Sequence, residues 1–148
     1  MTTAMETETA HDKLAENPAA DTSTLFAKVA FNQLLDLRRE FAENGVARLT
    51  LQARPELTNN FHVLHGGVIM TMLDGVMSSA ALSKSGFTRA VVTIDMSTSF
   101  LKPARGRLVA HGQAVGGGRS VCFCEARIED EAGELVAKAM GTFKYVDP

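Results

Sequence analysis

The apolar residues predict one long helix near the middle of the chain. Between positions 68 and 85 they recur every three or four residues, which is the spacing of one helix face. These residues are Val68, Ile69, Met72, Leu73, Val76, Met77, Ala80 and Ala81. The opposite face is small or weakly polar and has no Lys, Arg or Glu before Lys84. A solvated helix face normally carries such charges, so we expect other parts of the protein to cover this helix on every side.

Alternating apolar and polar residues predict strands on both sides of the helix. Residues 46–54 alternate in this way, and Pro55 ends the run. Four further strand-like runs follow the helix, at residues 89–101, 107–115, 120–129 and 134–145. The short connections between these runs favour an antiparallel meander.

The residues before the first strand predict a helix and a tail. Apolar residues at near-helical spacing indicate an amphipathic helix from about residue 24 to 43, with Asn44-Gly45 as its stop. Residues 1–22 are rich in Thr, Ala, Glu and Asp, which is typical of a flexible tail. Residues 23–148 then form a single domain. The expected fold class is α+β: a five-stranded antiparallel sheet wrapped around one long central helix, with an additional N-terminal helix.

Composition narrows the class of protein. The 148 residues are 45% hydrophobic and 22% charged, with a net charge of −2, and lack the basic excess of a nucleic-acid binder. No uninterrupted apolar run reaches membrane-spanning length, and residues 1–18 do not resemble a signal peptide. Cys122 and Cys124 are too close along one strand to bond each other easily and have too few neighbouring ligands for a metal site. We expect a cytoplasmic protein with reduced, buried thiols and without a metal, nucleic-acid or membrane partner.

The candidate chemistry lies at the start of the central helix. Asp74 is the only charge that this helix carries before Lys84, and its burial is costly unless the carboxylate is paired or functional. Gly66, in the polar corner His65-Gly66-Gly67, lies eight residues earlier, which is about 12 Å along the axis and about 80° around it. One ligand atom cannot touch both groups within one helix. If they cooperate, a second copy must approach antiparallel, as in a symmetric dimer. Each group also has a purely structural interpretation: Asp74 would be a buried, hydrogen-bonded carboxylate, and Gly66 and Gly67 would only allow a tight turn into the helix.

These residues also carry a family resemblance, which spans about residues 24–146. The order of elements and the spacing of Asn59, His65-Gly66-Gly67 and Asp74 resemble the hotdog-fold acyl-CoA thioesterases of the phenylacetate-pathway (PaaI-like) family. Thr93 stands where relatives often have Ser or Thr. Two further segments resemble the family, Phe100-Leu101-Lys102-Pro103-Ala104 and Gly118-Arg119.

The resemblance implies hydrolysis of an aryl or short-to-medium acyl-CoA to a free acid and coenzyme A. The Gly66 amide would stabilise the oxyanion, and Asp74 of the facing subunit would act as general base or nucleophile. Asn59 would position the water or the thioester, Thr93 would assist Asp74, and His65 would shape the loop and contact the thioester.

The resemblance also implies how the substrate is held and how the chain assembles. Gly67, Gly118, Arg105 and Arg119 are the expected contacts of the substrate and its coenzyme A, although a solvated sheet edge explains the arginines equally well. No separate cofactor is expected, because coenzyme A is part of the substrate and product. The chain would form a homodimer that pairs into a homotetramer.

Two other functions stay open for the same fold. One is hydration or dehydration of an enoyl or hydroxyacyl thioester, which would require a His with a Glu or Asp in other motifs. The other is a non-catalytic module that binds acyl-CoA without hydrolysing it.

Overall fold

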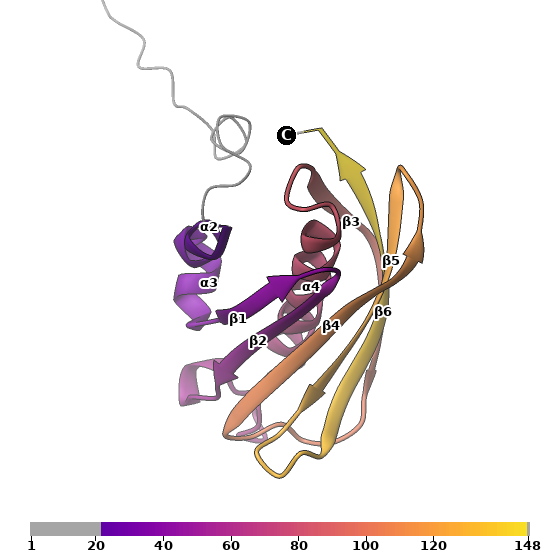
Figure 1. Ribbon diagram of the computed structural model, residues 1–148. Coiled ribbons are helices and arrows are strands. Elements are labelled where there is room, and N and C mark those ends of the chain that lie inside the picture. The colour runs from indigo at the N-terminus through magenta and orange to yellow at the C-terminus, as the bar shows by residue number, and fades with distance from the viewer. Residues whose placement is uncertain (1–21, 148) are drawn as a thin grey trace, which may run out of the picture.

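The computed structural model describes residues 22–147, and it consists of one sheet curled around one long helix (Figure 1). The central helix is α4 (Gly66–Lys84), and the strands are β1 (Arg38–Glu43), β2 (Val46–Gln52), β3 (Ala90–Phe100), β4 (Arg107–Gly117), β5 (Val121–Glu129) and β6 (Leu135–Val146). Their order across the sheet is β1-β2-β4-β5-β6-β3, with every neighbouring pair antiparallel. The expected class, an antiparallel sheet around a central helix, is confirmed. The prediction of a tail falls on residues 1–22, of which 1–21 lie outside the described part.

The sheet has six strands rather than the five expected, because the predicted helix 24–43 is wrong in its second half. The chain forms two short helices, α2 (Thr22–Lys28) and α3 (Ala30–Leu35). Asp36 then adopts a left-handed conformation, with φ 52°, which ends α3 and turns the chain into β1. The apolar spacing in this segment fitted a helix by coincidence.

The signal for the extra strand was the pair Asn44-Gly45. Both residues have positive φ, 49° and 82°, as the central residues of a type I′ hairpin turn require. The prediction that this pair stops a helix is wrong, because it joins β1 to β2. The hairpin supplies hydrogen-bond partners to one edge of β2, whose other edge pairs with β4. The hydrogen bonds gained along that edge of β2 stabilise the strand β1 more than the local apolar spacing stabilises a helix.

The core lies between α4 and the concave face of the sheet. Met72, Leu73, Val76 and Met77 of α4 are completely buried. β4 approaches α4 so closely that a Cβ added to Gly112 would lie 2.6 Å from the carbonyl oxygen of Val76. There is no room for a side chain at this contact. Glycine at position 112 therefore allows the sheet to pack this close to the helix.

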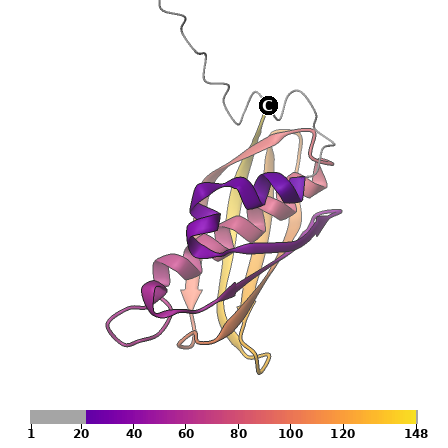
Figure 2. The same ribbon diagram turned by 90° about the vertical axis from the view of Figure 1, so that its left-hand side faces the viewer.

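One face of α4 is not covered within a single chain. α2 and α3 lie across the helix on the side that the sheet leaves open (Figure 2), but nearer its start Gly67 is exposed and Met70 is 39% exposed. Asp74 is half-buried. The prediction that the helix is covered on every side is therefore wrong for the single chain. By length and hydropathy α4 is also the one described helix that could cross a membrane, but core helices pass the same test and α4 is the core helix.

We expect Gly112→Ala to lower the free energy of unfolding by about 1–3 kcal/mol, because the new methyl group must push β4 away from α4. Gly118→Ala is the matched control, since a Cβ there has no neighbouring atom within 4 Å. Urea unfolding followed by circular dichroism measures both. Equal stabilities of the two variants would contradict the close approach.

Candidate active site

The centre of the candidate site is a hydrogen bond between β3 and α4. The hydroxyl of Thr93 donates to Oδ1 of Asp74 at 2.7 Å. Both are predicted site residues, and the structure brings them together at the open face of α4. A carboxylate held by one oxygen keeps the lone pairs of the other available for a reactant.

A bulge in β3 aims Thr93 at the helix. Thr93 pairs with Phe143 of β6, but Asp95 pairs with the adjacent residue Thr142, so Ile94 is the extra residue in β3. Paired residues share a face of the sheet. Thr93 therefore lies on the inner face with the buried Phe143, while Asp95 lies on the outer face. The bulge thus separates the functional hydroxyl from a nearby second carboxylate.

The start of α4 presents one free backbone donor. His65 is the N-cap residue, and its Nδ1 accepts a hydrogen bond of 2.8 Å from the Gly67 amide. A neutral imidazole that accepts at Nδ1 carries its proton on Nε2. No residue between 22 and 147 accepts a hydrogen bond from the Gly66 amide. The Gly66 N–H therefore faces outward at the positive end of the helix, where it suits an anionic oxygen.

Asn59 holds the loop that leads into this helix. Its Oδ1 accepts hydrogen bonds from the amides of Phe61, at 2.9 Å, and Val63, at 3.4 Å. The Nδ2 group of Asn59 has no acceptor among the described residues. The carbonyl half of the side chain is thus used to shape the loop, and the amide half is free to meet a water or a ligand.

β3 links the two halves of the site. A Cβ added to Gly66 would lie 3.4 Å from the Phe100 ring, so the end of β3 contacts the start of α4, whereas Thr93 contacts Asp74 further along the helix. The strand and helix therefore run antiparallel. Gly66 and Asp74 stay about 12 Å apart along the axis, as expected from eight helical residues.

The residues predicted to bind coenzyme A lie at opposite ends of the chain's fold. Nη1 of Arg105 donates to the carbonyl of His62, in the loop before α4. Gly118 and Arg119 lie in the turn between β4 and β5, where the Arg119 carbonyl accepts from Arg89, the residue before β3. Because β3 rises about 3.3 Å per residue, this turn is roughly 30 Å from Gly66. One chain does not bring Gly118 and Arg119 to Gly66.

The two cysteines are not nucleophiles of this site. Both are buried, and their Sγ atoms lie 3.7 Å apart. Burial, and then the neighbouring Cys122, raises the pKa of the Cys124 thiol, which keeps it protonated and unreactive.

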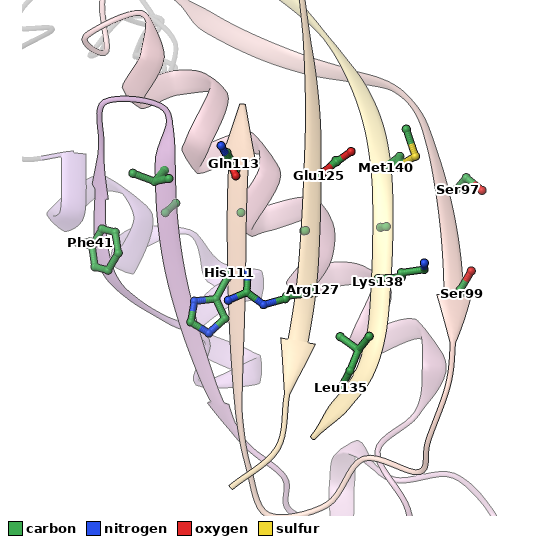
Figure 3. A pocket seen from close by; sticks show the side chains of 15 residues that line it. Phe41, Ser97, Ser99, His111, Gln113, Glu125, Arg127, Leu135, Lys138 and Met140 are labelled. Carbon is green, nitrogen blue, oxygen red and sulfur yellow. The ribbon is translucent and has the colours of Figure 1, made fainter. Parts of the chain in front are cut away.

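A hollow of about 500 Å³ lies on the outer face of the sheet, on the side away from α4 (Figure 3). Its lining includes His111, Arg127 and Lys138, which point away from α4. The whole thickness of the sheet separates this hollow from Asp74, so it is not part of the candidate site.

Known proteins match this chain both in sequence and in structure. The model of the family described as "Thioesterase superfamily" matches residues 61–137. A protein of Saccharolobus solfataricus named "Putative esterase" is 30% identical over 130 residues, which cover 86% of this chain and 92% of that protein. A solved "Thioesterase family protein" from Silicibacter pomeroyi superposes with a TM-score of 0.79 at 25% identity, covering 90% of this chain and 98% of its own.

The chain therefore belongs to the thioesterase superfamily. Its architecture is the hotdog fold, shared with the E. coli PaaI protein from the phenylacetic acid degradation operon. That structure superposes with a TM-score of 0.79 at 19% identity, over 90% of this chain and 96% of its own. The resemblance to this class of thioesterases, seen in the motifs of the sequence, is confirmed.

The free Gly66 amide can be tested by a matched pair of variants. Gly66→Pro removes the N–H donor, and proline suits the first position of a helix. His65, with φ −60° and ψ 136°, already has the extended conformation that a following proline requires. Gly66→Ala retains the donor. We expect Gly66→Pro to lower kcat for acyl-thioester hydrolysis by about 10²–10³-fold and Gly66→Ala to have a much smaller effect, measured as free thiol. Equal losses in both variants would show that the donor is not used.

Proposed function

We propose that this protein is an acyl-CoA thioesterase that hydrolyses an acyl-CoA to a free acid and coenzyme A. The observation that carries the proposal is the Thr93–Asp74 hydrogen bond on an open face of α4, a helix whose first amide is also free. Membership of the thioesterase superfamily supports the reaction type. The proposal requires no cofactor, because coenzyme A enters as part of the substrate and leaves as product.

In the proposed mechanism, groups that the fold already positions stabilise the developing negative charge and accept the proton of the attacking water. The Gly66 amide donates to the thioester oxygen as negative charge develops on it. Asp74, oriented by Thr93, either takes a proton from the attacking water or attacks the carbonyl carbon itself. The C–S bond then breaks, and the sulfur leaves as the thiol of coenzyme A after it receives a proton, from Asp74 in the first route and from solvent in the second. In the second route water then hydrolyses the mixed anhydride formed on Asp74, which releases the free acid. Nδ2 of Asn59 and Nε2 of His65 are free to contact the water or the thioester.

The two key groups come from different subunits in this proposal. β3 is an edge strand, and antiparallel pairing of β3 with its copy would set the two α4 helices antiparallel. Ile94 is an extra residue in β3, so Thr93 of one copy lies opposite Phe100 of the other when the two-fold axis passes through Ser97. This register pairs residues 93–100 and so uses most of β3, which spans Ala90–Phe100. It would place Asp74 of one copy beside Gly66 of its partner.

Exposed apolar side chains support this interface. Val92 and Ile94 of β3 are 49% and 55% exposed, and Phe61, before the start of α4, is 73% exposed. A row of exposed apolar residues along an unpaired strand edge is typical of a contact surface. A monomer by light scattering at micromolar concentration would contradict the shared site.

The same axis supports the proposed coenzyme A contacts. It exchanges the two ends of β3, so the Arg119 turn of one copy would approach the Arg105 loop of the other. Both guanidinium groups would then lie near the partner-completed site, where they suit the phosphates of coenzyme A. Residues that one chain keeps roughly 30 Å apart would converge in the dimer.

Hydration of an enoyl thioester is less well supported by the same residues. Such chemistry needs a His working with a Glu or Asp, and Nδ1 of His65 is occupied by the Gly67 amide. The His–carboxylate pair found in the described part of the chain is His111 with Glu129, at 3.5 Å. His111 lines the hollow on the outer face of the sheet, away from Asp74.

We expect Asp74→Asn to reduce thiol release from acyl-CoA at least 10²-fold, because the amide cannot accept the proton or attack the carbonyl. Asp74→Ala should lose as much. Asp36→Asn is the matched control, since Asp36 is an exposed carboxylate at the end of α3 and should retain full activity. A panel of aryl, short and medium acyl-CoAs, followed by a thiol reagent, measures all three variants. The proposal fails if wild type turns over no thioester or if both Asp74 variants stay fully active.

A further inference from the structure

An apolar cavity of about 550 Å³ lies under the N-terminal helices, beside the second half of α4. Its lining comes from α2, α3, β1, α4 and the start of β3, together with residues beside these elements. The large apolar side chains are Leu25, Phe26, Val29, Leu82, Phe87 and Val91, and the polar or cationic ones include Lys28, Asn32, Arg39 and Arg89. Among the described residues, no Asp or Glu lines it. Most of the lining is apolar, which favours an apolar chain as the ligand.

The cavity is adjacent to the Asp74–Thr93 pair. Gly75, the residue after Asp74, lines it, as does Ser78, one helical turn beyond Asp74. Val91 of β3 also lines the cavity. Val91 precedes Thr93 by two residues, so both side chains lie on the same face of the strand. A thioester carbonyl at Asp74 can therefore extend its acyl chain into the cavity along α4, away from the partner's Gly66.

Three side chains hold the wall of the cavity that lies beyond the last turn of α4. The guanidinium carbon of Arg39 lies 4.9 Å from the centre of the Phe26 ring and 5.9 Å from that of the Phe87 ring, within the range of cation–π attraction. Phe87 itself has φ 59°, which is unfavourable for an aromatic residue. Strained residues of this kind persist where the surrounding structure requires them, often at ligand sites.

The length of the cavity limits the acyl group. From Gly75 to Leu82, α4 advances seven residues, or about 10 Å. An extended chain covers about 3.4 Å for every three backbone bonds, so the cavity accommodates roughly nine bonds. That length corresponds to an acyl group of about eight to ten carbons.

We propose that this cavity binds the acyl chain of a medium-chain acyl-CoA, and that Phe87, held by Arg39 together with Phe26, sets the upper limit of chain length. This inference rests on the proposed thioesterase function and names its substrate class. The N-terminal helices are then a specificity element, because they supply one side of the acyl site.

The test is the chain-length profile of kcat/KM for saturated acyl-CoAs with even carbon numbers from short to long, with phenylacetyl-CoA included. For wild type we expect kcat/KM to rise about fourfold with each added methylene, to reach a maximum at about eight to ten carbons, and to fall for longer chains. Phe87→Gly removes the ring and accepts the positive φ without strain, so the maximum should move to longer chains. Ser78→Leu fills the cavity and should move it to shorter chains.

Phe123→Ala is the control, because Phe123 is an exposed aromatic residue that does not line the cavity; its profile should match wild type. A maximum that is the same in all four proteins overturns the inference while the thioesterase proposal stands. A higher kcat/KM for phenylacetyl-CoA than for any medium-chain substrate also overturns it.

If no thioester is turned over, the thioesterase proposal fails, but the cavity is still tested by calorimetry with free saturated fatty acids of the same lengths. Binding that is tightest at eight to ten carbons, and at least tenfold weaker in Ser78→Leu, supports the acyl site. Equal binding by wild type and Ser78→Leu overturns it.

Discussion

The rigidity of one helix governs the rest of this structure. The free Gly66 amide and the Asp74 carboxylate are fixed about 12 Å apart on α4, too far to act on one carbonyl group. No side-chain movement closes this gap, because both groups belong to the same hydrogen-bonded helix. A second α4, running antiparallel, removes the problem by presenting the start of one helix to the middle of the other. The open face of α4 and the unpaired edge of β3 are what such a pairing needs.

The two halves of α4 accordingly have different surroundings. Its second half is covered by the sheet and by the N-terminal helices, with an apolar cavity between them. Its first half has one open face, which includes Gly67 and Met70, and the Thr93–Asp74 hydrogen bond lies at the boundary between the two halves. Two departures from regular backbone accompany this boundary, the bulge at Ile94 and the positive φ of Phe87. The first aims a hydroxyl at the carboxylate, and the second places an aromatic ring at the cavity, so both are explained by the site rather than by the fold.

Periodicity in the sequence was sufficient for most of the fold. The limits of the central helix and of five strands were predicted to within about two residues, because each buries one regular face against the core. The strand β1 was missed, since its edge pairing with β2 is a tertiary interaction that local spacing does not record. In the site, spacing identified Asp74 and Gly66, the family resemblance added Thr93, and the structure joins Thr93 to Asp74. It did not reveal the Phe87 wall, which depends on a backbone angle, nor that Gly118 and Arg119 lie far from Gly66 in the same chain.

The claim that one subunit supplies the amide and the other the carboxylate has a direct test. Asp74→Asn and Gly66→Pro chains are co-expressed with different tags, and the mixed dimer is purified. One of its two sites then combines an intact Gly66 with an intact Asp74, whereas the other contains both substitutions. The mixed dimer should recover about half of the wild-type rate of thiol release, although both parent dimers are nearly inactive. A mixed dimer as inactive as its parents would place both groups in the same chain and contradict the account.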